Sequence, residues 1–187
     1  MKNVSKDKNW IYIIWNPKSK ISIIEYVDLE CPTCKIFHFA WIINSVIESY
    51  WDNINFSFRH FPLNIHKQAS MEAEALECIA DLWWKEKFFS WLNLIFLNSK
   101  TSWDSYTKET ISELSKNLWL DQNKVFDCIN SWKFSEKVQS QRAEWLSIWV
   151  KWTPWILIKN NETWKSKMVF WLYPFEQLKA EIDSVLK

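Results

Sequence analysis

The chain has 187 residues and a formal net charge of +1, with 23 basic and 22 acidic residues. This length suits one domain, or one domain with an insertion, and the balanced charge gives no electrostatic basis for binding nucleic acid. The apolar stretches are short and interrupted by charge, so no transmembrane helix is expected. Residues 1–9 are polar and hold no hydrophobic signal core, so either the protein stays inside the cell or a signal or anchor is missing from this chain.

The composition is unusual because the chain has no glycine and 16 tryptophans. Glycine averages about 7% of residues, so about 13 would be expected in a chain of this length. Several tryptophans, among them Trp15, Trp51 and Trp119, lie at turn or helix-end positions that favour glycine. Our hypothesis is that many of them are glycines in the native protein, encoded by UGA codons that were translated as tryptophan. The alternative is a protein that is truly rich in tryptophan.

The first predicted elements alternate between strand and helix. Residues 10–14 fit a short edge strand, and Ile21–Val27 fits a buried central strand because it is apolar and β-branched. A helix is predicted over residues 32–50, where apolar residues recur near helical spacing. Residues 54–61 alternate apolar and polar, which predicts a half-buried strand.

The middle of the chain is helical in pattern. Predicted helices cover residues 67–82, 85–97, 107–118, 123–129 and 133–146. Strands return at 154–159 and 167–170, and a terminal amphipathic helix covers 174–186.

The order β-α-β, helical block, β-β-α is that of an α/β protein with a thioredoxin fold and an inserted all-helical subdomain. We expect residues 1–65 and 149–187 to form the thioredoxin fold, the second part holding a loop, a hairpin and the terminal helix. Residues 66–148 would form the insertion.

The most informative motif, Cys31-Pro32-Thr33-Cys34, lies between the central strand and the first helix. The N–H groups and partial positive charge of a helix N-terminus stabilise a thiolate, which can attack a disulfide while a second thiol resolves the product. Half of a zinc site is the alternative. It fits poorly, because structural zinc usually takes four Cys or His ligands and the chain has no second CxxC. We expect neither a metal nor a cofactor.

Cys78 and Cys128 lie in two different predicted helices. They are either buried thiols that behave as small apolar residues, or partners in a structural disulfide that ties the two helices together. The even cysteine count favours the disulfide, and a disulfide would argue for an oxidising compartment.

Four ordered motifs make the chain resemble the DsbA-like thiol–disulfide oxidoreductases over nearly its full length. They are Glu25–His38, Phe58–Leu63, Trp119–Asp121 and Trp149–Pro154. The family usually has glycine where this chain has Trp119, Trp149 and Trp152, so the glycine hypothesis restores the family pattern. Cys78 and Cys128 also resemble a cysteine pair of the helical domain in some members.

The resemblance implies an enzyme that exchanges disulfides with protein substrates as a disulfide-forming oxidase. A membrane or soluble redox partner would reset its CxxC, and a reductase or isomerase is the near alternative. Cys31 would be the exposed nucleophile with a lowered pKa, and Cys34 the more buried resolving thiol. Pro32 and Thr33 would tune the couple. Strongly oxidising members carry histidine at the place of Thr33, so a milder oxidant is expected here.

The resemblance also assigns roles outside the CxxC. Glu25 would be a buried acid with a raised pKa that assists proton transfer, although an ion pair with Arg59 is an equal alternative. Thr153-Pro154 would be a cis-proline step that faces the CxxC and, with Trp152, binds substrate peptide by strand addition.

The same resemblance implies an extracytoplasmic location, in the periplasm or cell envelope, with the cytoplasm as the alternative. A different function remains open: a thioredoxin-like peptide-binding or chaperone module with a structural Cys31–Cys34 disulfide. The histidines give no support to a Cys-His hydrolase. We expect His38 to be a packing residue, and His60 and His66 to lie in loops or at strand ends.

Overall fold

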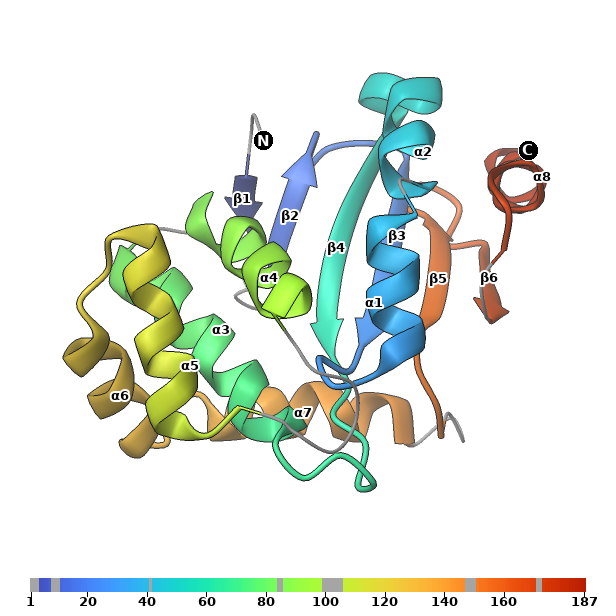
Figure 1. Ribbon diagram of the computed structural model, residues 1–187. Coiled ribbons are helices and arrows are strands. Elements are labelled where there is room, and N and C mark those ends of the chain that lie inside the picture. The colour runs from blue at the N-terminus through green and yellow to red at the C-terminus, as the bar shows by residue number, and fades with distance from the viewer. Residues whose placement is uncertain are drawn as a thin grey trace. The chain divides into compact units, whose positions relative to one another are not determined.

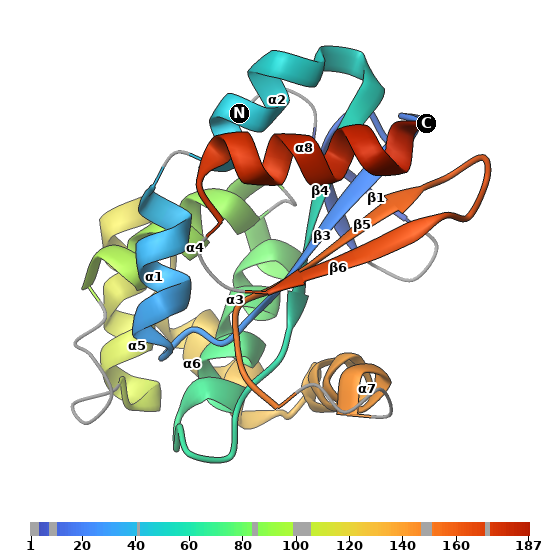
Figure 2. The same ribbon diagram turned by 90° about the vertical axis from the view of Figure 1, so that its right-hand side faces the viewer.

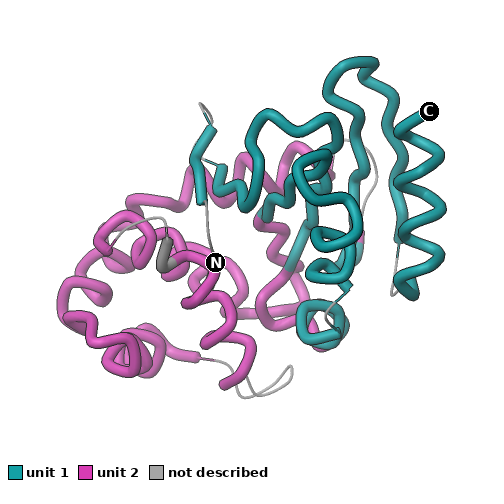
Figure 3. The backbone as a smooth tube through the Cα atoms, turned by 90° about the horizontal axis from the view of Figure 1, so that it is seen from above, with its two compact units in different colours: residues 1–27, 33–59, 152–187 teal, residues 28–32, 60–151 magenta. Residues whose placement is uncertain are grey.

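The computed structural model describes residues 4–7, 11–40, 42–83, 86–98, 106–146, 151–170 and 173–187. The chain forms two compact units (Figure 3). The first consists of residues 1–27, 33–59 and 152–187, and the second of residues 28–32 and 60–151. Among the described residues, no helix combines the length and apolar character needed to cross a lipid bilayer.

The first unit is built on a mixed sheet. Its strands are β1 (Val4–Lys6), β2 (Tyr12–Trp15), β3 (Ile21–Val27), β4 (Ile54–His60), β5 (Trp155–Asn160) and β6 (Ser166–Phe170). Their order is β1-β2-β4-β3-β5-β6. β3 and β4 point the same way (Figure 1), whereas β5 is antiparallel to both β3 and β6. These pairings give the predicted parallel strand pair and the predicted C-terminal hairpin.

Two predictions about the strands are wrong. The strand predicted at 10–14 is not an edge strand, because β1 pairs outside β2 with Ser5 opposite Ile13. β1 escaped prediction since its three residues, Val-Ser-Lys, carry no strand period. β4 is buried on both faces rather than half-buried, with Arg59 as its one partly exposed residue.

The helices of the first unit cover part of this sheet. They are α1 (Pro32–Phe39), α2 (Ile42–Tyr50), the 3-10 helix η1 (Trp51–Asn53) and α8 (Phe175–Leu186). α8 lies against β5 and β6 and beside α2 (Figure 2), and buries Leu178, Ile182 and Val185. The Tyr50 hydroxyl donates to the Lys179 carbonyl at 3.1 Å and joins α2 to α8.

The single helix predicted over 32–50 is two helices. α1 ends at Phe39, where the Ala40 N–H donates to the Phe37 carbonyl at 3.2 Å in a tightened last turn. α2 then begins at Ile42, and Trp41 lies outside the described residues.

The second unit is a helical bundle around α3. Its helices are α3 (Ala69–Trp83), α4 (Glu86–Asn98), α5 (Lys108–Leu114), the 3-10 helix η2 (Ser115–Leu118), α6 (Gln122–Asn130) and α7 (Ser135–Leu146). α3 contacts α4, α5, α6 and α7, so it forms the centre of this core. Caps fix two helix starts: Thr107 and Thr110 form a capping box on α5, and the Asp121 carboxylate accepts from the Asn123 N–H on α6.

Positive backbone φ occurs only at tryptophan among the described residues. The residues are Trp15 (78°), Trp51 (45°), Trp119 (60°), Trp132 (56°) and Trp164 (64°). A bulky side chain disfavours this region by about 1–3 kcal/mol, whereas glycine enters it without steric cost. Trp119 caps η2 in the left-handed conformation and is 96% exposed, so its indole gains little from packing. The backbone therefore supports the glycine hypothesis at these five positions.

Candidate active site

The CxxC motif lies where β3 passes into α1. The Cys31 N–H donates to the Asp28 carbonyl at 3.2 Å, which forms a turn between the strand and the helix. Pro32 is the first residue of α1, a position where its missing N–H costs no helical hydrogen bond. Cys34 is the third residue of the helix, so the motif has the helix-start placement that its sequence predicted.

The two thiols differ in solvent access. Cys31 is 7% exposed and Cys34 is 0% exposed, and neither takes part in a disulfide in this structure. The expectation of an exposed Cys31 is therefore wrong in degree, because the turn at residues 28–31 is itself buried. The order of the two is as expected, and Cys31 is the one sulfur of the motif that retains a path to solvent.

Glu25 is a buried acid on β3, 2% exposed. Burial raises its pKa from the ordinary 4.5 to about 8. Its Oε1 has no hydrogen-bond partner among the described residues, and no ion pair there joins it to Arg59. The buried-ion-pair alternative is thus wrong, and Glu25 holds a proton at neutral pH.

Thr153 and Pro154 lie at the end of the sheet where β3 ends. Their peptide bond is cis. Pro154 directly precedes β5, whose first residue, Trp155, pairs with Tyr26 near the end of β3. The next pair along is Glu25 with Ile156. Thr153 and Pro154 are buried, whereas Trp152 is exposed.

The segment before Cys31 is bound to the loop that follows β4, within the second unit. Asp28 accepts the N–H of Leu63 through Oδ2 at 2.7 Å, and Glu30 accepts the N–H of Gln68 through Oε2 at 2.7 Å. The Asp28 Oδ2 also lies 2.9 Å from Nδ1 of His66. Sequence reasoning gave Asp28 and Glu30 no role. The one available signal was two acids next to the motif in an otherwise apolar stretch.

Glu72 on α3 belongs to the same acidic surroundings. Burial raises its pKa to about 8, the negative charges of Glu30 and Asp28 add to the rise, and a hydrogen bond from the Tyr106 backbone opposes it. The protonated form of Glu72 is therefore favoured at neutral pH. In the described part of the chain, no set of three or more such side chains is arranged to hold a metal ion.

A second buried histidine forms a different kind of pair. His60 Nε2 lies 3.0 Å from Oε1 of Glu77, whose other oxygen lies 2.6 Å from Nζ of Lys137. Burial lowers the pKa of His60, outweighing the hydrogen bond to Glu77, which raises it. Like His66–Asp28, this network joins a buried histidine to a carboxylate, but here burial lowers the pKa of the histidine instead of the carboxylate raising it.

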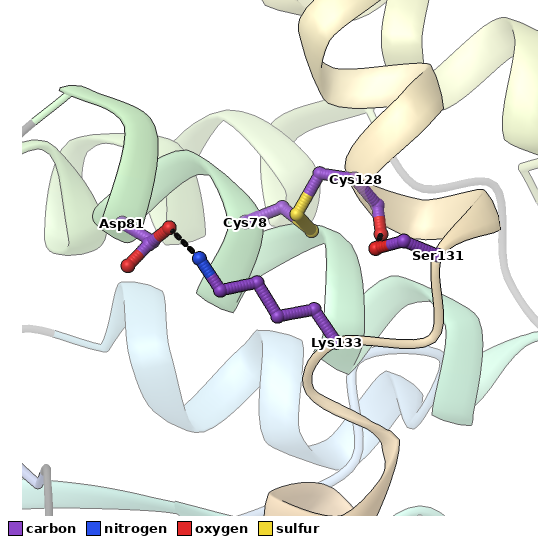
Figure 4. Close-up of a disulfide and its surroundings, with 5 residues drawn as sticks. All are labelled: Cys78, Asp81, Cys128, Ser131 and Lys133. Atoms are coloured by element: carbon purple, nitrogen blue, oxygen red, sulfur yellow. Dashed lines mark hydrogen bonds and ion pairs between the residues drawn. A yellow bond between two sulfur atoms is a disulfide. The ribbon is translucent and has the colours of Figure 1, made fainter.

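Cys78 and Cys128 form a disulfide that joins α3 to α6 (Figure 4). Their Cα atoms are 5.9 Å apart. Close to the disulfide, Lys133 forms an ion pair with Asp81. The Ser131 hydroxyl donates a hydrogen bond to the Cys128 carbonyl. Of the two alternatives for these cysteines, the structure contains the disulfide.

The chain matches the thioredoxin family model over residues 11–183, and it belongs to that family. No curated protein sequence matches it. Its fold is similar to that of Pseudomonas aeruginosa DsbA2, with a TM-score of 0.79 and 23% identity over 92% of each chain. Oxidised BdbD from Bacillus subtilis has a TM-score of 0.79 and 17% identity, over 93% of this chain and 91% of its own.

Wolbachia pipientis alpha-DsbA1 is also similar, with a TM-score of 0.77 and 22% identity over 100% of this chain and 92% of its own. At these identities the likeness is one of fold. It confirms the predicted α/β thioredoxin fold of the DsbA type.

Proposed function

We propose that this protein is a thiol–disulfide oxidoreductase that acts on protein substrates through Cys31 and Cys34, as a disulfide-forming oxidase. The observation that carries the proposal is the CxxC motif at the start of α1, whose first sulfur alone keeps solvent access. Membership of the thioredoxin family and the DsbA-type fold support it.

The exchange has two steps that balance in electrons. A substrate thiolate attacks Sγ of Cys31 in the oxidised motif, the Cys31–Cys34 bond breaks, and Cys34 leaves as a thiolate. A second substrate thiolate then attacks the substrate sulfur of the mixed disulfide, and Cys31 leaves as a thiolate. The substrate loses two electrons and gains a disulfide, and the motif becomes a dithiol.

Glu25 is the proposed proton donor and acceptor for Cys34. Cys34 is fully buried, so a thiolate released there needs a proton from within the protein. Glu25 holds a proton at neutral pH because burial raises its pKa to about 8. It belongs to the same unit as Cys34, on the strand that leads to the motif.

The proposed substrate site includes Thr153 and Pro154, with Trp152 beside them. An extended substrate segment would pair with their backbone in the manner of strand addition. Pro32 and Thr33 are proposed to tune the potential, and Thr33 adds no positive charge to the motif.

The proposed location is extracytoplasmic, and the proposed partners are exported proteins and a membrane or soluble protein that reoxidises the motif. The Cys78–Cys128 disulfide supports this location, because structural disulfides persist in oxidising compartments.

The direct test mixes the oxidised protein with a reduced protein substrate that has two cysteines, and follows disulfide formation by mass spectrometry. We expect Cys31→Ser to abolish oxidation. Cys34→Ser is instead mixed with the disulfide-bonded form of the substrate: the Cys31 thiolate attacks that disulfide, one substrate thiolate leaves, and the mixed disulfide at Cys31 accumulates because no second motif thiol resolves it. The Cys78→Ser/Cys128→Ser variant is the matched control and should still oxidise substrate below its melting temperature. If wild-type Cys31 resists alkylation at pH 6 and no substrate is oxidised, the protein is a peptide-binding module instead.

A further inference from the structure

His66 is a histidine of the second unit whose pKa is raised in part by the charge of a motif cysteine, Cys31. It lies in the loop between β4 and α3, and its side chain is 8% exposed. Nδ1 lies 2.9 Å from Oδ2 of Asp28, three residues before Cys31. The proposed function so far gives this residue no part.

Backbone hydrogen bonds fix the loop that carries His66. The His66 N–H donates to the Leu63 carbonyl at 3.0 Å, and Leu63 donates its own N–H to Asp28. On the other side, Arg142 of α7 donates from Nε to the Pro62 carbonyl at 2.8 Å and from Nη2 to the Asn64 side chain at 2.6 Å. The imidazole is therefore held beside the segment 28–31, not left to sample solvent.

The groups facing this imidazole are mostly acidic. The hydrogen bond to Asp28 raises the pKa of His66, burial opposes the rise, and the charges of Asp28, Cys31 and Glu30 add to it. Glu72 faces Asp28 and Glu30 from α3 but is mostly protonated at neutral pH. The guanidinium of Arg142 is the basic group bound to the same loop.

We propose that His66, held by Asp28, is a positioning residue whose imidazolium stabilises the thiolate of Cys31, supplying beside the motif the positive charge that Thr33 lacks. This inference rests on the proposed function, since it concerns the same sulfur. The imidazolium favours the reduced motif, where Cys31 is an anion, over the disulfide, where it is neutral. It therefore makes the couple more oxidising and speeds the release of Cys31 from a mixed disulfide.

Coupling of two charges is reciprocal, which gives a test in the wild-type protein. If the imidazolium stabilises the thiolate, the thiolate stabilises the imidazolium by the same free energy. We expect the NMR titration of the His66 ring to show a higher pH midpoint in the reduced protein than in the oxidised protein. Equal midpoints in the two redox states would overturn the proposal.

A variant separates this charge from a purely structural role. In His66→Asn the amide can still donate to Asp28 from the Nδ1 position, but the charge is gone. We expect alkylation of Cys31 at pH 6 to slow about tenfold, because the loss of a stabilising positive charge that shifts the thiol pKa by about one unit reduces the thiolate fraction by about that factor. The equilibrium constant between the Cys31–Cys34 couple and glutathione should change by the same factor. This makes the couple more reducing by about 30 mV.

His60→Gln is the matched control, because it removes the other buried histidine–carboxylate pair of this unit. We expect it to lower the melting temperature while leaving the Cys31 alkylation profile unchanged. An unchanged profile in His66→Asn, or an equal shift in His60→Gln, would overturn the proposal. Neither measurement requires substrate turnover, so failure of the oxidase assay and failure of this inference are distinguishable.

Discussion

Cys31 and Cys34 lie within one helical turn at the start of α1, whereas Cys78 and Cys128 are 50 residues apart and join α3 to α6. A disulfide that closes a long loop removes much of the entropy of the unfolded chain, and one that closes a four-residue loop removes little. The first kind is a permanent brace. The second can be broken and remade at small cost to the fold, which suits exchange.

The two cysteine pairs also differ in the charged groups near them. Cys31 follows Asp28 and Glu30 in the chain, and its charge is one of the causes that raise the pKa of His66. Cys78 is buried in the centre of the helical unit. Burial alone does not distinguish the two pairs, since both are largely buried. Loop length and nearby charge are what set the pair proposed to exchange apart from the structural one.

Removing the structural disulfide should have the largest effect on folding. For Cys78→Ser/Cys128→Ser, the loop of 50 residues predicts a loss of about 4 kcal/mol in the free energy of unfolding. Urea denaturation with the Cys31–Cys34 pair held reduced measures it. A loss below about 1 kcal/mol would break the comparison, because the two pairs would then brace the fold equally little.

Glu25→Gln should have the next largest effect, and it should depend on pH. The pKa of Glu25 is raised from 4.5 to about 8, so the folded state binds a proton that the unfolded state releases, and stability falls as pH rises through this range. The glutamine variant loses this slope. We expect it to be more stable than wild type by about 4 kcal/mol at pH 8 and nearly equal at pH 4.

The same variant should slow exchange, since the proposed proton donor to Cys34 is gone. Thermal unfolding and stopped-flow oxidation of a peptide dithiol across this pH range measure both effects. If the stability of the two proteins changes with pH in the same way, the account of Glu25 is contradicted.

The sequence predicted those features that depend on local pattern. Nearly every helix and strand lies within a few residues of its predicted range, because apolar periodicity and turn residues are local signals. The break after Phe39 was missed because apolar spacing continues across it. Asp28–His66 was also missed, since it joins residues 38 apart and no period in the sequence links them. The buried state of Glu25 could be expected, because a lone acid in an apolar central strand has no route to water.

Trp119→Gly should have the smallest effect, and it lies in neither cysteine pair, so it sets the scale against which the disulfide and Glu25 effects are compared. The backbone of Trp119 has the left-handed conformation, and the residue is 96% exposed. Replacing it with glycine should therefore add about 1 kcal/mol to the free energy of unfolding. Trp119→Ala is the control and should gain less, because alanine also resists positive φ. Intact mass of the protein from its native source tests the glycine hypothesis itself, since tryptophan at every such position would end it.

The most direct test of the central claim is a redox titration of the whole protein in glutathione and dithiothreitol buffers, with both cysteine pairs followed by alkylation and mass spectrometry. We predict that Cys31 and Cys34 titrate as one two-electron couple, less oxidising than the roughly −120 mV of DsbA but well above about −300 mV. Cys78–Cys128 should stay oxidised below about −300 mV, the range of structural disulfides. A Cys31–Cys34 pair that is reduced only together with Cys78–Cys128 would contradict the account.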